Sequence, residues 1–171
     1  MDKYHFRKYN PKFKKFFTEE SNKIKNILGN NSQIEHIGST AIPNLGGKGI
    51  IDILIGVGDR EMESTKLKLM EVGYEFREVA STKERLFFRI DYPYKKSLHR
   101  IHIHLTRFDN RDWREIIYFR DYLLKNPWAV EEYIKIKKEG VKKAMGDGAI
   151  YREYKRKFIE KIYKLALKQI N

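Results

Sequence analysis

A carboxylate inside an apolar run is the feature that most constrains this sequence. Residues 50–57 read IIDILIGV, and Asp52 is the one charged residue of this run. The β-branched, apolar composition predicts a strand in the interior of a sheet. Burying a carboxylate there costs free energy unless a metal ion, a cation or hydrogen bonds compensate its charge. We therefore expect Asp52 to belong to a site.

A turn of small residues lies upstream of this run. Gly38, Ser39 and Thr40 follow a strand that we predict over residues 33–37. Glycine lets the backbone come close to a ligand, and the two hydroxyl groups lie beside exposed N–H groups. A phosphate at Gly38, Ser39 and Thr40 with a metal ion at Asp52 is the chemistry that this layout suits.

The pattern of Gly-Ser followed, after a gap, by Asp in a strand resembles the signature of the nucleotidyltransferase superfamily. More narrowly, GSTAIPNLGGKGIIDILIGV resembles the GrpB family, and the resemblance continues through HRIHIHLT, FRDYLLKNP and YREYKRKF over nearly the whole chain. It implies an α/β (α+β) fold of nucleotidyltransferase type, with a small mixed sheet of about five strands flanked by helices and a helical C-terminal portion. It also implies binding of a nucleotide or another phosphorylated small molecule, with Mg²⁺ or Mn²⁺ as the cofactor.

Three positions depart from that resemblance. Gly49 stands where the family commonly has Pro, and Leu54 stands where an active nucleotidyltransferase has its second carboxylate. The strand expected to supply a third carboxylate, over residues 99–106, contains no Asp or Glu. Asp91 could supply it, although Asp is also common at the start of a turn for local reasons. The resemblance therefore supports the fold and leaves the transfer chemistry open.

Periodicity and capping residues predict the remaining elements. Asn10 and Pro11 are typical of a helix start and Gly29 of a helix end. A second helix is predicted from Asp59 to Val72, and further strands are predicted over residues 74–79, 85–91 and 99–106, the last two joined by a turn over residues 91–98. Three helices should follow, after Asn110, from Pro127 and from about Gly148, with apolar faces that include Trp113, Ile116, Ile117, Leu123, Leu124, Val130, Tyr133, Ile134, Val141, Tyr151, Tyr154, Phe158, Ile162 and Leu165.

His102 and His104 alternate with apolar residues and so share one face of the predicted strand over residues 99–106. Two such rings can share a ligand or a metal ion, and they are equally typical of a solvated sheet face. The resemblance to GrpB places a His-x-His strand beside the site. Asp52, His102 and His104 are therefore the candidate catalytic and metal-binding residues, although imidazole suits Mn²⁺ or Zn²⁺ better than Mg²⁺.

Each C-terminal helix places a cation on or beside its apolar face. These cations are Arg120, Lys137 and Lys155, and Tyr151 shares the inward face with Lys155. A single long basic side chain can extend out to solvent, which would explain any one of them. Three in succession predict convergence over the Gly-Ser turn and Asp52, where they would hold a polyphosphate.

Two further residues are candidates near that turn. Lys48 follows Gly46 and Gly47, but GGKG lacks the spacing and the hydroxyl residue of a Walker A loop. Lys48 is therefore either a second phosphate contact or a surface lysine in a loop. Glu35 is a candidate salt-bridge partner for one of the inward cations.

Composition limits the class of protein. A chain of 171 residues with 41% hydrophobic residues is expected to form a single globular domain over residues 1–171. The absence of cysteine excludes disulfides and thiol catalysis and fits a cytoplasmic location, and no apolar run reaches membrane-spanning length. A net charge of +13 favours phosphate-bearing partners, or it reflects no more than a lysine-rich surface.

Three functions remain open. The first is nucleotidyl transfer from a nucleoside triphosphate with a metal ion at Asp52. The second is binding of a nucleotide or phosphometabolite without transfer, or an accessory role beside another enzyme. The third is nucleic-acid binding, although most aromatic residues fall on predicted core faces. A second acidic side chain near Asp52 would favour the enzyme, and cations alone around it would favour the binding protein.

Overall fold

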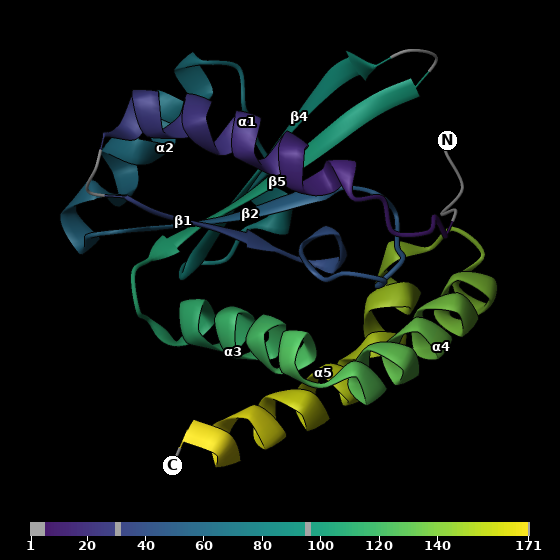
Figure 1. The fold of residues 1–171 in the computed structure, drawn as a ribbon. Helices are drawn as coiled ribbons and strands as arrows, with labels where there is room; N and C mark the ends of the chain where they lie inside the picture. The colour runs from purple at the N-terminus through teal and green to yellow at the C-terminus, as the bar shows by residue number, and fades with distance from the viewer. Residues whose placement is uncertain (1–5, 30–31, 95–96, 171) are drawn as a thin grey trace.

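The computed structural model describes residues 6–29, 32–94 and 97–170 of the chain. A sheet lies in the middle, with α1 and α2 on one side and α3, α4 and α5 on the other (Figure 1). The strands are β1 (Gln33–Ile37), β2 (Ile51–Val57), β3 (Glu75–Phe76), β4 (Arg85–Tyr94) and β5 (Ser97–Arg107). The helices are α1 (Lys12–Leu28), α2 (Met62–Glu71), α3 (Arg111–Lys125), α4 (Pro127–Ala144) and α5 (Gly148–Ile170), with single 3-10 turns η1 (Ser39–Ala41), η2 (Asp59–Glu61) and η3 (Glu78–Ala80).

The sheet is mixed and has the order β1-β2-β5-β4-β3. β2 and β5 run parallel, whereas the other neighbouring pairs are antiparallel. β2 is an interior strand, as its apolar composition requires. The predicted α/β fold, with a mixed sheet of five strands flanked by helices and a helical C-terminal portion, is confirmed.

The two faces of the sheet have different compositions because side chains alternate along each strand. On one face, Ile53 of β2 and Ile103 of β5 are fully buried beneath α1 and α2, where they pack with Ile24 and Leu69. The opposite face of the same strands carries Asp52, His102 and His104, because Asp52 is paired in register with His102. The strand pairing therefore brings the candidate polar residues together on one face.

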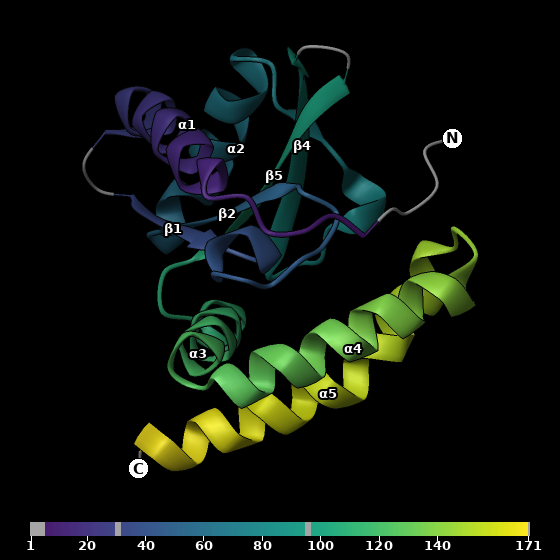
Figure 2. The ribbon, with the colours of Figure 1, turned by 45° about the vertical axis from the view of Figure 1, so that its right-hand side comes forward.

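The three C-terminal helices form their own apolar layer. α4 and α5 lie side by side along their length (Figure 2), and the rings of Tyr133 and Phe158 stack between them with centroids 4.8 Å apart. Ile42 and Leu45, from the loop after η1, belong to the same buried cluster. The docking of α4 and α5 against this loop fixes which helical side chains reach the sheet.

Several local predictions need correction. Leu124 is 48% exposed, because its neighbour Leu123 takes the inward position and successive residues of a helix point about 100° apart. The predicted strand over residues 74–79 is a two-residue β3 followed by η3, and the predicted helix from Asp59 begins as η2. β4 and β5 extend through most of the predicted turn, whose residues 95–96 lie outside the described residues.

The predicted ends of the first helix agree with the structure within one residue. The Asn10 side chain accepts a hydrogen bond from the Lys12 backbone N–H at 3.0 Å, and Gly29 ends α1 with φ of +81°. Among the helices in the described ranges, none combines the length and apolar character needed to cross a bilayer.

Candidate functional site

Asp52 lies at the centre of the polar face. Its Oδ1 lies 3.2 Å from His102 Nδ1 and 3.8 Å from His104 Nε2, and the Phe87 ring packs against both imidazoles. Burial would raise the pKa of Asp52, but its interactions with the His102 and His104 rings outweigh burial and hold the pKa well below its usual range. Asp52 is therefore a carboxylate throughout the neutral pH range, and 23% of its side chain is exposed.

The turn after β1 lies directly against this carboxylate. Gly38 has φ of +70°, and a Cβ added there would overlap Asp52 Oδ2, so the close approach requires glycine. Ser39 Oγ lies beside Gly47. Thr40 is turned inward instead, with its hydroxyl bonded to the Ile50 carbonyl and to His36 Nε2, each at 3.0 Å. The turn thus places Gly38 against Asp52 and Ser39 beside Gly47, while the hydrogen bonds of Thr40 stabilise the loop.

Lys137 reaches this turn from α4. Only 4% of the residue is exposed, and its Nζ donates a hydrogen bond of 2.5 Å to the Gly46 carbonyl. The ammonium also lies over the Tyr133 ring, 5.4 Å from its centroid. Burial is the largest cause that lowers the pKa of Lys137 from 10.5 to about 7, and the charges of Lys155 and Lys48 lower it further.

Lys48 and Lys155 complete the group. Their ammonium groups lie 5.0 Å and 4.2 Å from the centroid of the buried Tyr151 ring, so one aromatic ring contacts both cations. Burial and then the charge of Lys155 lower the pKa of Lys48 to about 8, and burial also lowers the pKa of Lys155. The Asp52 carboxylate partly offsets these shifts at all three amines. We call Lys48, Lys137 and Lys155 the lysine trio.

Arg120 does not join the lysine trio. Its guanidinium donates to Glu35 at 2.6 Å, to Asp121 at 2.8 Å and to the His36 carbonyl at 3.0 Å. The predicted role of Glu35 as a salt-bridge partner for an inward cation is thus confirmed. The bonds to Glu35 and the His36 carbonyl link α3 to β1. These contacts explain why a cation lies on the apolar face of α3, and no ligand is needed to explain it.

The site does not fit a pair of divalent ions. Leu54 is fully buried at the position where a second carboxylate was sought, and Asp91 forms a two-point ion pair with Arg100 on β5. His102 Nδ1 lies within hydrogen-bond distance of Asp52 Oδ1, and His104 Nε2 faces the same oxygen at 3.8 Å, so both nitrogens are directed at the carboxylate oxygen rather than at an empty point between the three side chains. In the described ranges, no set of three or more His, Asp or Glu side chains is arranged to hold a metal ion. Mg²⁺ or Mn²⁺ at Asp52, His102 and His104 stays a prediction that these donors do not favour.

Among the residues that support the lysine trio, Tyr151 was a predicted site residue, whereas Tyr133, Gly46 and Gly47 were not. Tyr133 was assigned to the core, yet its ring also lies beneath Lys137. Gly46 supplies the carbonyl for Lys137, and a Cβ at Gly47 would lie 2.7 Å from Lys137 Nζ. The adjacent pair of glycines before Lys48 was a usable signal, because two glycines in succession indicate backbone that another group approaches closely.

Comparison with known proteins places the chain in one family. A family model described as GrpB protein matches residues 4–165. The glutamate-rich protein GrpB of Alkalihalophilus pseudofirmus is 32% identical over 155 residues, which is 88% of each chain. A UPF0157 protein of Halalkalibacterium halodurans is 31% identical over 92% of this chain and 80% of its own length. The crystal structure of conserved protein GrpB from Enterococcus faecalis is 31% identical, covers 97% of this chain and 99% of that one, and has a TM-score of 0.82. This chain therefore belongs to the GrpB family.

Proposed function

We propose that this protein binds a phosphorylated small molecule, such as a nucleotide, through the lysine trio and the turn at Gly38 and Ser39. The observation that carries the proposal is that three lysine amines gather at the turn that packs on Asp52. Lys137 Nζ bonds to the Gly46 carbonyl and lies near Ser39 Oγ, and Lys48 and Lys155 share the Tyr151 ring. Within the part of the chain that the structure describes, no further acidic side chain joins Asp52 and the two histidines in a metal-binding set.

An anionic ligand would offset the free-energy cost of keeping several buried amines charged in the free protein. Burial, and then the like charges of neighbouring amines, disfavour the charged forms of Lys48 and Lys137 and lower their pKa values. A phosphate group carries about two negative charges near neutral pH and offers several acceptor oxygens to ammonium donors. The buried rings of Tyr133 and Tyr151 hold the amines in place, so little side-chain entropy remains to be lost on binding.

Transfer chemistry and nucleic-acid binding have less support. The two-metal clamp that stabilises phosphoryl transfer needs several oxygen ligands, and Leu54 removes one of them. Single-stranded nucleic acids stack their bases on exposed aromatic rings, whereas Tyr133 and Tyr151 are 7% and 3% exposed. We therefore propose binding without transfer, in a cytoplasmic protein as the cysteine-free composition suggests.

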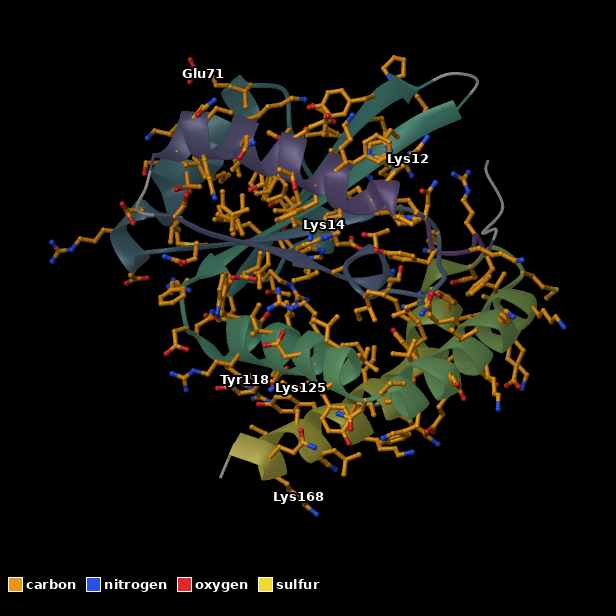
Figure 3. The ribbon with its side chains drawn as sticks, in the orientation of Figure 1. Lys12, Lys14, Glu71, Tyr118, Lys125 and Lys168 are labelled. Atoms are coloured by element: carbon orange, nitrogen blue, oxygen red, sulfur yellow. The ribbon has the colours of Figure 1, made fainter. Side chains whose placement is uncertain are left out.

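Calorimetric titration with ATP and with pyrophosphate tests this proposal, in EDTA and again with Mg²⁺. We expect binding in EDTA, and a loss of roughly tenfold or more in affinity for Lys155→Gln, because one charge-assisted contact is removed. Lys168→Gln is the matched control, since Lys168 extends from the same helix on the side away from the sheet (Figure 3) and is exposed. A folded wild type that binds neither anion would overturn the proposal, and binding that requires Mg²⁺ would restore the metal-dependent alternative.

A further inference from the structure

The two oxygens of Asp52 have different surroundings. Oδ1 faces both His102 and His104. Oδ2 lies against Gly38, and among the described residues no side chain or backbone group donates a hydrogen bond to it. Oδ2 is not one of the described polar atoms that are both buried and without a hydrogen-bond partner. An unbonded Oδ2 is therefore accessible, in agreement with the 23% exposure of the Asp52 side chain. Oδ2 is therefore an acceptor that solvent or a ligand can reach.

The chemistry of this oxygen restricts what can bind there. An aspartate side chain is ordinarily ionised at neutral pH, so Oδ2 accepts hydrogen bonds and has no proton to donate. A phosphate oxygen placed against it would be repelled. An ammonium group of a ligand would be attracted to Asp52 but repelled by the lysine trio. A neutral hydroxyl group is compatible with both the Asp52 carboxylate and the lysine trio, because it can donate a hydrogen bond to the carboxylate without adding charge.

The lysine trio and Asp52 meet at the same turn. A Cβ added at Gly47 would lie 2.4 Å from Ser39 Oγ and 2.7 Å from Lys137 Nζ, and the neighbouring Gly38 lies against Asp52 Oδ2. We propose that the ligand carries a hydroxyl group close to its phosphate, and that Asp52 Oδ2 accepts a hydrogen bond from that hydroxyl. The ligand class is then a phosphorylated polyol or sugar, which includes the ribose of a nucleotide. This inference rests on the proposed phosphate binding and assigns Asp52 the role of a specificity residue rather than a metal ligand.

Two phosphate esters that differ in their hydroxyl groups test the inference on the wild-type protein. Glycerol 3-phosphate has free hydroxyl groups, and propyl phosphate has the same carbon chain without them. We expect the wild type to prefer glycerol 3-phosphate by roughly tenfold or more, the range expected for a hydrogen bond to a charged group. Pyrophosphate serves as the reference, because it probes the lysine trio alone.

Asp52→Asn tests the assigned atom. We expect the preference for glycerol 3-phosphate to fall to about twofold or less, while pyrophosphate binds as tightly or more tightly because a negative charge is gone. Asp109→Asn is the control, since Asp109 is a half-exposed surface residue paired with Arg114. Thermal unfolding of each variant shows whether it is folded.

The outcomes separate the inference from the function on which it rests. A wild type that binds pyrophosphate but does not distinguish the two esters would refute the hydroxyl contact and leave phosphate binding intact. A preference that survives in Asp52→Asn would refute the role of Asp52. A wild type that binds none of the three compounds would overturn both proposals. The comparison of the two esters needs no variant, so it tests the hydroxyl preference of the site even if Asp52→Asn fails to fold.

Discussion

Replacing Lys137 with methionine should stabilise the fold at neutral pH and remove part of its pH dependence. Lys137 is 4% exposed, and its pKa is lowered from 10.5 to about 7, mainly by burial. Below about pH 7 both the folded and the unfolded chain hold this proton, and the fold bears the full cost of a buried charge. As the pH rises from about 7 toward 10.5, the folded protein releases the proton while the unfolded chain keeps it. The unfolded state then binds more protons, so stability must rise with pH in this window.

The size of the effect follows from the same pKa values. Each tenfold change in proton affinity is worth about 1.4 kcal/mol, so the lowered pKa of Lys137 corresponds to roughly 5 kcal/mol as an upper limit. Between pH 6.5 and pH 10 the wild type should recover roughly 4 kcal/mol of this amount. Methionine has no proton to release, but it leaves the Gly46 carbonyl without its donor, at a cost of roughly 1–3 kcal/mol. Relative to the wild type, the free energy of unfolding of Lys137→Met should thus be raised most at low pH, and the difference should disappear near pH 10.

Urea unfolding at pH 6.5, 8 and 10, followed by the fluorescence of Trp113 and Trp128, measures this difference. Other groups also titrate in this range, and the comparison between wild type and variant removes their common contribution. Lys142→Met on the same helix is the control, because Lys142 is exposed. A difference between Lys137→Met and wild type that stays constant across the three pH values would refute the reasoning.

The remaining predictions concern the site and its supports. The affinity for propyl phosphate should fall as the pH rises from 7 to 9, because Lys137 and Lys48, with pKa values of about 7 and about 8, lose charge; an affinity that rises over this range in calorimetry would contradict this. Gly38→Ala should lower the free energy of unfolding by roughly 3 kcal/mol or more, and by more than Gly29→Ala, which shares a positive φ but has open space at the Cβ position instead of Asp52. Arg120→Met should cost roughly 1–3 kcal/mol in urea unfolding by breaking its bonds to Glu35 and the backbone; a tenfold loss of phosphate affinity would show that Arg120 belongs to the site after all.

The fold was predictable because its signals are local. The apolar run around Asp52 and the strict alternation at His102 and His104 determine strands and faces from sequence spacing alone. Parallel pairing of β2 with β5 then places these three residues on one face. The helix ends at Asn10 and Gly29 likewise follow from capping preferences.

The composition of the site was less predictable, because it depends on how helices dock. Periodicity assigns Arg120 and Lys137 to apolar faces in the same way, yet only Lys137 reaches the Gly-Ser turn while Arg120 pairs with Glu35. Lys48 lies in a loop, where no period exists to predict its direction. Thr40 was expected to face the ligand, but a neighbouring carbonyl and imidazole attract its hydroxyl inward. Such choices are made by tertiary contacts between residues far apart in the chain.

The hydrogen bond from Lys137 to the Gly46 carbonyl joins positions 91 residues apart. A chain in which α4 and α5 had detached from the sheet would keep Asp52 on β2 but would lack Lys137 and Lys155, two of the three amines. An anion that needs all three selects the fully assembled state and stabilises it by mass action. Ligand binding should then slow amide hydrogen exchange in α4 and α5 more than in α1 and α2. The phosphate would thereby hold the C-terminal helices against the sheet.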